Sequence, residues 1–166
     1  MADAPAPKLA TPTDLKTNQL SNVADALNAA LADCFALYIK TKNFHWHVSG
    51  PHFRDYHLLL DDQATQIQSI TDAIAERVRK TGNLTLHSIG DIGRRQTIKD
   101  NDHDFVSPAD MLAELRDDNL KLVESFRNVK ELAEAAKDNA TSGIVDEWTD
   151  QAEERAWFLF EASRAA

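Results

Sequence analysis

Apolar residues recur along the chain at intervals of three and four positions, the spacing that places them on one face of an α-helix. Four long segments carry this pattern: about 14–48, about 52–80, a third that begins at Ser107, and about 141–164. No strong alternation of the kind typical of a β-strand appears, and Pro and Gly lie only where helices could begin or end. The pattern therefore predicts an all-α protein.

Short local motifs mark the expected helix ends. The Ser-Gly-Pro turn at 49–51 is expected to stop the first helix, and the Thr-Gly pair at 81–82 the second. Ser107 is suited to cap the third helix, with Pro108 in its first turn. Thr141 is expected to cap the fourth helix.

A polar connection of about 25 residues separates the second and third helices, and its segment LHSIGDIGRR could form a short extra helix. A connection of this length is typical of a crossover between parallel neighbours in a helix bundle. We therefore expect a ferritin-like four-helix bundle over residues 15–166. The Ala/Pro/Thr-rich segment 1–14 cannot bury enough apolar surface to order itself and is expected to be a mobile tail.

Charge and cysteine content limit the expected binding partners and the expected cellular compartment. The chain has 18 Lys and Arg against 27 Asp and Glu, and its formal charge of −9 repels nucleic-acid phosphate and attracts cations. The single cysteine, Cys34, is expected to be a buried, inert thiol in a reducing compartment. No segment approaches the roughly twenty apolar residues of a membrane span, and no secretory signal is evident. We therefore expect a soluble cytoplasmic protein with no membrane partner, either free or associated with the nucleoid.

The segment NFHWHVSGPHFRDYHLLLDDQ, residues 43–63, holds four of the six histidines and two adjacent aspartates. It is either a metal site or a polar corner between two helices. His57 and Asp61 are four residues apart in the second helix, as are Asp72 and Glu76, so each pair shares a helix face. Each pair alone is more typical of solvated surface residues than of a metal site. The pairs are separated by about three turns, however, and all four side chains fall near one stripe.

A straight helix cannot hold one ion with both pairs. Asp61 and Asp72 are about 16 Å apart along its axis, whereas each metal ligand lies about 2 Å from the ion. Antiparallel packing of this helix against its copy in a second chain solves the problem. A two-fold axis near residues 66 and 67 would place His57 opposite Glu76 of the partner subunit, and Asp61 opposite Asp72 of the partner subunit. Two equivalent sites would then form at one interface.

His45, near the end of the first helix, can fold back over the second helix and add an imidazole. The set then contains two histidines and three carboxylates, a mixture of N and O donors that suits Fe(II) or another divalent first-row ion. The set contains no thiolate, which argues against a structural Cys-rich zinc site, although zinc itself could still bind.

The same region contains His45-Trp46, Gly50, Phe53, His57, Asp61 and the run DAIAER at residues 72–77. At these spacings the residues resemble the ferroxidase signature of the Dps family of mini-ferritins. The resemblance covers roughly residues 20–164 and includes DNATSGI before the fourth helix and AWFL near the end. It implies a hollow homo-dodecamer with di-iron ferroxidase centres between two-fold-related chains. One chain would supply His45, His57 and Asp61, and the other would supply Asp72 and Glu76.

The resemblance also implies a function. An iron-storage and detoxification ferroxidase would bind Fe(II), oxidise it with hydrogen peroxide in preference to dioxygen, and keep the ferric mineral in the shell, which protects against oxidative stress. Two alternatives remain open: a DNA-compacting nucleoid protein with weak iron chemistry, and a structural shell that stores metal without redox turnover. DNA binding is doubtful, because the charges before residue 21 and after Trp157 balance in sign.

Two further features are given by the resemblance alone. Trp46 adjoins His45 and could intercept oxidising equivalents near the centre, although an aromatic anchor at the helix corner is the simpler interpretation. The resemblance also places acidic iron-entry pores on the three-fold axes. The residues matched to these pores are Asp138, Gly143 and Glu147, with Asp146 as the candidate to replace the acidic residue that Gly143 lacks.

Acidic residues at the start of a helix are also ordinary partners of the helix dipole. The four remaining histidines do not match the ligand pattern, and we expect them at the corner, at the surface or in the long connection: His47, His52, His87 and His103.

Overall fold

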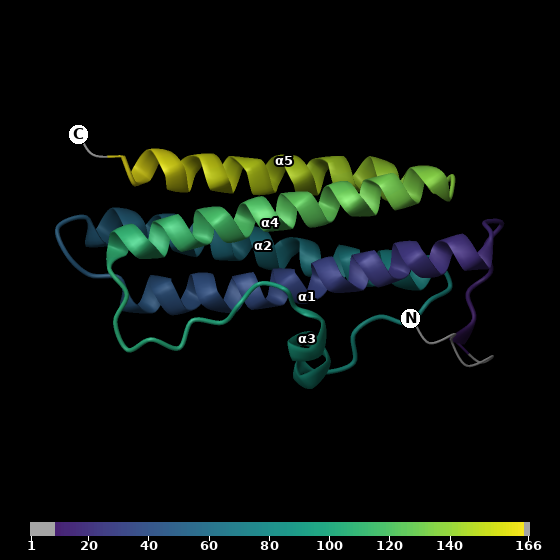
Figure 1. The fold of residues 1–166 in the computed structure, drawn as a ribbon, viewed down its shortest axis with the longest axis horizontal. Coiled ribbons are helices and arrows are strands. Elements are labelled where there is room, and N and C mark those ends of the chain that lie inside the picture. The colour runs from purple at the N-terminus through teal and green to yellow at the C-terminus, as the bar shows by residue number, and fades with distance from the viewer. Residues whose placement is uncertain (1–8, 165–166) are drawn as a thin grey trace.

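The computed structural model describes residues 9–164. The secondary-structure elements in this range are all α-helices. Four long helices form a bundle: α1 (Thr17–His47), α2 (Phe53–Lys80), α4 (Pro108–Ala135) and α5 (Asn139–Ala162). The short helix α3 (Ile89–Arg95) lies on the connection between α2 and α4 (Figure 1). The predicted bundle, with a short extra helix in a long crossover, is confirmed.

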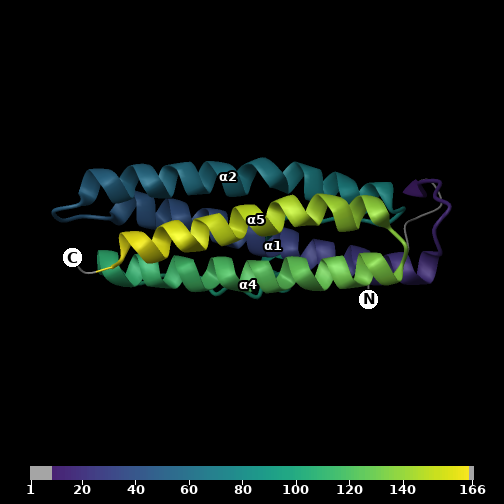
Figure 2. The same cartoon turned by 90° about the horizontal axis from the view of Figure 1, so that it is seen from above.

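Figure 2 shows α2 and α4 on opposite sides of the bundle, with α1 and α5 between them. Helix α1 packs against α2 and α4, and α5 packs against α4 and more loosely against α2. Helices α2 and α4 run parallel, as the long connection predicts, but they occupy opposite corners and are not neighbours. This arrangement is possible because the crossover passes around the outside of α1, where α3 also packs.

The core is apolar and continuous along the bundle. The rings of Phe126 and Trp148 pack with centroids 5.9 Å apart, and both residues are buried. Full burial of side chains of this size contributes about 1.5–3 kcal/mol each. Cys34 lies in the same core, and burial raises the pKa of its thiol to about 12. The expectation that Cys34 is buried is confirmed.

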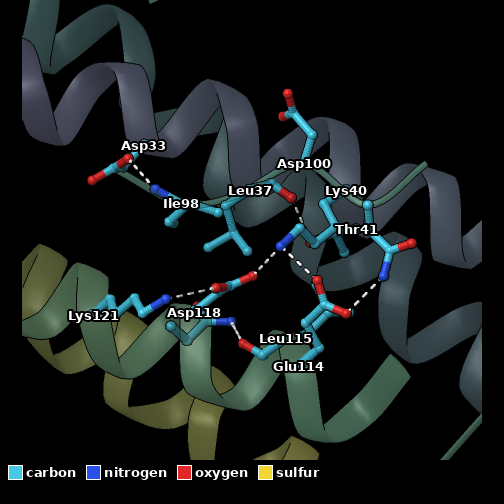
Figure 3. Close-up of polar contacts among 12 residues, drawn as sticks. Asp33, Leu37, Lys40, Thr41, Ile98, Asp100, Glu114, Leu115, Asp118 and Lys121 are labelled. Carbon is cyan, nitrogen blue, oxygen red and sulfur yellow. Dashed lines mark hydrogen bonds and ion pairs between the residues drawn. The ribbon is translucent and has the colours of Figure 1, made fainter. Parts of the chain in front are cut away.

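A buried ionic network connects α1 to α4 (Figure 3). The Lys40 ammonium is 2.6 Å from Asp118 Oδ2 and 2.8 Å from Glu114 Oε1, and both Lys40 and Asp118 are buried. Burial raises the pKa of the Asp118 carboxyl, and the hydrogen bond from Lys40 acts in the opposite direction. The network fixes the register of α1 against α4.

The crossover is bonded to α1 on both sides of α3. The Asp33 carboxylate is buried and accepts hydrogen bonds from Ile98 N at 2.9 Å and from Thr97 Oγ1 at 2.8 Å. Before α3, Asn28 Nδ2 donates to the carbonyl of Leu84 at 2.9 Å. These bonds hold a long, polar connection on the bundle without secondary structure along most of it.

The observed N-cap of α4 agrees with the sequence prediction, whereas the observed N-cap of α5 differs from it. Ser107 caps α4 as predicted, and its hydroxyl accepts from the backbone N–H of Asp110. The prediction that Thr141 caps the last helix is wrong, because α5 begins earlier and its N-cap is Asp138. The Asp138 carboxylate accepts from Thr141 N at 3.1 Å. A carboxylate at this position also favours the positive end of the helix dipole.

The turn between α1 and α2 contains Gly50 at φ +104°, a conformation that disfavours residues with a Cβ. The predicted tail falls partly outside the described residues, since residues 1–8 are not among them. From residue 9 the chain lies against the end of α2, where Arg79 Nη2 donates to the carbonyl of Leu9 at 2.6 Å. Within the described part of the chain, no helix combines the length and the apolarity needed to cross a membrane.

Candidate metal centre

The corner between α1 and α2 brings two predicted ligands together. His45 lies in the last turn of α1 and is buried, and His57 lies in the second turn of α2. The turn around Gly50 folds one over the other, and their rings stack with centroids 3.8 Å apart and planes at 21°. His45 therefore folds back over α2 as predicted.

The two histidines are oriented by each other's backbone. His45 Nδ1 is 2.7 Å from the carbonyl oxygen of His57, and His57 Nδ1 is 2.9 Å from the carbonyl oxygen of His45. A carbonyl oxygen only accepts, so each Nδ1 carries the hydrogen and donates it. In the neutral form of each ring, Nε2 then keeps its lone pair. Metal-binding histidines are commonly held by this kind of bond, which fixes the ring and its tautomer.

The third predicted ligand, Asp61, lies one turn beyond His57. Its Oδ1 is 3.9 Å from His45 Nε2, and the same oxygen is 2.7 Å from Lys42 Nζ. The hydrogen bond from Lys42 lowers the pKa of the Asp61 carboxyl, so this group is a carboxylate at neutral pH. The sequence prediction missed Lys42. A signal was present, since Lys42 precedes His45 by three residues and therefore shares its helix face.

The other two predicted ligands lie farther along the same exposed stripe of α2. Asp72 and Glu76 are exposed, and Glu76 Oε2 accepts from Lys80 Nζ at 3.0 Å. Within residues 9–164 of one chain, no three or more His, Cys, Asp or Glu side chains are close enough to hold a metal ion. One chain thus presents two separate partial ligand sets, the separation that a straight helix dictates.

Trp46 lies beside the first of these sets. Its side chain is 60% exposed, and Lys42 Nζ is 5.8 Å from the centre of its ring. Within one chain the ring is therefore not a buried anchor of the helix corner. The four histidines that do not match the ligand pattern are all exposed: His47, His52, His87 and His103.

The predicted pore residues differ in their surroundings. Asp138 is 2% exposed, and besides capping α5 its carboxylate is 3.0 Å from Arg77 Nη2, so within one chain it has a structural role. Asp146, Glu147 and Gly143 are exposed near the start of α5. Asp146 is 2.8 Å from Lys130 Nζ, and this hydrogen bond raises the pKa of Lys130.

A surface hollow of about 460 Å³ lies between α1 and the crossover, and none of the predicted metal ligands lines it.

Comparison with known proteins supports the class of fold. Residues 24–162 match the ferritin-like domain. The chain is 34% identical over 146 residues to a low temperature-induced protein of Nostoc sp., across 87% of this chain and 82% of that one. It is 31% identical over 149 residues to the DNA protection during starvation protein of Agrobacterium fabrum, across 90% of this chain and 92% of that one.

A solved structure has the same architecture. The Dps protein of Vibrio cholerae O1, described as a member of a broad superfamily of ferritin-like diiron-carboxylate proteins, aligns with a TM-score of 0.85 and 27% identity, over 90% of this chain and 94% of that one. The bundle, its crossover and the matched domain are those of a ferritin-like protein. The chain belongs to the Dps family of ferritin-like proteins, as the resemblance of its sequence to the ferroxidase signature of that family implied.

Proposed function

We propose that the protein binds Fe(II) at centres shared between two chains, oxidises it, and stores the ferric product in a hollow homo-dodecamer. The observation that carries this proposal is the stacked pair His45 and His57, with both Nδ1 atoms bonded to backbone carbonyls and both Nε2 atoms left to coordinate. Asp61 lies beside them as an anionic donor. Such an arrangement suits a metal site better than a polar helix corner, where neither ring would need a fixed tautomer.

The partner chain would complete each centre through Asp72 of the partner subunit and Glu76 of the partner subunit. Anionic oxygen donors stabilise Fe(III) relative to Fe(II), which favours oxidation. Two ferrous ions together supply the two electrons that hydrogen peroxide accepts. The O–O bond breaks, two protons are taken up, and two molecules of water form without release of hydroxyl radical. Complete reduction of dioxygen to water needs more electrons than one such pair supplies, and its two-electron reduction releases hydrogen peroxide, so peroxide is the better matched oxidant. Zinc and other divalent ions would compete for the same donors.

Iron entry would use the exposed carboxylates near the start of α5, where Asp146 and Glu147 lie. The formal charge of −9 on each chain attracts ferrous ions to such a shell. Removal of both Fe(II) and peroxide would protect the cell against oxidative stress.

Stopped-flow absorbance tests the proposal directly. We expect rapid appearance of ferric absorbance when anaerobic protein loaded with Fe(II) is mixed with hydrogen peroxide, and a slower reaction with dioxygen. A shell that only stores metal would oxidise Fe(II) no faster than the buffer does, and this result would reject the ferroxidase.

Lys42 should oppose metal binding, because an incoming ion must displace its ammonium group from Asp61. We expect Lys42→Met to tighten Zn²⁺ binding by about two- to fivefold at pH 7, the factor expected for a half-exposed ion pair. Isothermal titration calorimetry measures this change, with Zn²⁺ as a probe that cannot change oxidation state. Lys99→Met, which removes an exposed lysine of the crossover, is the matched control. Unchanged affinity in Lys42→Met would mean that Lys42 does not compete with the metal ion for Asp61.

DNA binding is expected to be weak. Twelve chains at −9 each carry a formal charge of about −108, which repels duplex DNA. We therefore expect no gel shift near neutral pH and physiological salt. A shift seen only with Mg²⁺ would indicate ion bridging between two anionic surfaces. Salt-sensitive, sub-micromolar binding without divalent metal would instead support the DNA-compacting function.

A further inference from the structure

A second polar site lies on the surface of the bundle, away from the metal stripe. The seam between α2 and α5 holds an open cavity of about 140 Å³. Gln63 and Arg155 are buried at its base, whereas Asp62 and Glu154 are exposed at its rim. Gln63 lies on the side of α2 that faces α5, whereas Asp61 and Asp72 face outward, so this cavity is independent of the proposed ferroxidase centre.

Arg155 is a buried cation that forms no ion pair within residues 9–164. The residue is 1% exposed, its Nε donates to Asn119 Oδ1 at 2.7 Å and its Nη1 donates to Gln66 Oε1 at 2.8 Å. Both acceptors are neutral amides, and Nη2 has no partner among the described residues. Burial lowers the pKa of Arg155 to about 10, so the guanidinium is still charged at neutral pH. Buried charges in proteins are normally paired, because an unpaired one is costly.

Gln63 contributes a complementary atom to the same cavity. Its Nε2 donates to the backbone carbonyl of Arg155 at 3.2 Å, which directs the amide oxygen elsewhere. That oxygen, Oε1, is buried and has no partner among the described residues. Two of the residues that line the cavity therefore carry a buried charged donor and a buried neutral acceptor, each without a partner among the described residues.

We propose that this cavity binds a small protonated oxyanion, either hydrogencarbonate or dihydrogenphosphate. An anionic oxygen of the ligand accepts from Arg155 Nη2, and its hydroxyl group donates to Gln63 Oε1. A water molecule could make both hydrogen bonds, but it would leave the buried charge uncompensated. Nitrate and chloride lack the hydroxyl donor. The carboxylates of Asp62 and Glu154 at the rim favour a monoanion over a dianion.

Calorimetric titration of the full, assembled, metal-stripped protein tests the site. Sodium hydrogencarbonate and sodium phosphate are titrated separately near pH 7, with sodium nitrate as the anion that has no hydroxyl group. We expect one saturable site per chain for at least one of the two oxyanions and none for nitrate. Whichever oxyanion binds more tightly identifies the ligand.

Variants at the base and the rim of the cavity assign the binding to it. Gln63→Leu removes the acceptor and should weaken binding by about three- to tenfold. Arg155→Met should abolish binding. Glu154→Gln changes an exposed residue, so it does not threaten folding, and it should tighten binding about two- to fivefold because it removes repulsion at the rim.

Glu153→Gln is the matched control, since this exposed neighbour pairs with Arg127 and does not line the cavity. Absence of saturable oxyanion binding would overturn the proposal, and so would equal binding of nitrate. Binding that is the same in Glu154→Gln, Gln63→Leu and the control would also overturn it.

Discussion

Asp61→Asn is expected to slow peroxide-driven Fe(II) oxidation by at least about 100-fold, and Asp72→Asn by a similar factor, because each loses an anionic donor that favours Fe(III). Shells assembled from an equal mixture of the two variants should recover roughly a quarter of wild-type activity. Where an Asp61→Asn chain meets an Asp72→Asn chain, one centre of the pair carries both defects and the other carries none. Half of the pairs in a random mixture are of this kind.

Stopped-flow absorbance measures the rates, and light scattering checks that each shell has a mass near twelve times 18.5 kDa. His47→Ala is the matched control, because His47 is an exposed neighbour of His45 and is not a predicted ligand. Well-mixed shells of the correct mass that recover no activity would contradict a centre shared between chains.

Lys40→Met is expected to lower stability by about 3–5 kcal/mol, the usual cost of leaving a buried charge without its partner. The variant leaves Asp118, at 3% exposure, without the ammonium group that lies 2.6 Å from its carboxylate. Thermal melting at a fixed protein concentration should show a midpoint lower by about 10 °C. Adding Asp118→Asn to the same chain should restore part of the loss, since it removes the unpaired charge.

The stability lost in Lys40→Met should depend on pH through Asp118. Burial already raises the pKa of the Asp118 carboxyl group. A buried acid with a raised pKa is stabilised when it is protonated, so the deficit should shrink as the pH falls through that pKa. Lys121→Met is the control: its ammonium is 3.7 Å from the same carboxyl group but is exposed, and its loss should cost under about 1 kcal/mol. Equal losses in the two variants would mean that burial does not decide the strength of this network.

The sequence predicted most of the fold, because helix formation leaves local patterns in the sequence. The helical spacing of apolar residues, the turn at Gly50 and the N-cap at Ser107 could all be predicted from such patterns. The Asp138 cap was not, since Asp138 and Thr141 are both good capping residues and the end of the preceding helix decides between them. The position of α2 relative to α4 was also not readable, because it depends on the path of the crossover around α1.

The candidate site was partly predictable for a similar reason. Spacing placed His57 and Asp61 on one stripe, and the turn at Gly50 suggested that His45 would join them. The mutual orientation of the two imidazoles depends on backbone carbonyls that no side-chain pattern encodes. Arg155 also escaped notice, although it precedes Leu159 by four residues and therefore falls on the core face of α5.

The burial of Cys34 has a consequence for how the protein ages in contact with peroxide. Cys34 is the chain's one cysteine, and Met111 is the one methionine among the described residues; they are 0% and 2% exposed. Peroxide attacks the thiolate form of cysteine, and a thiol with a pKa of about 12 supplies very little of it. Oxidised sulfur at these two positions, detected by mass spectrometry, would therefore identify chains that had unfolded. The oxidised fraction would measure how much unfolding a sample had undergone, independently of the amount of iron that it had processed.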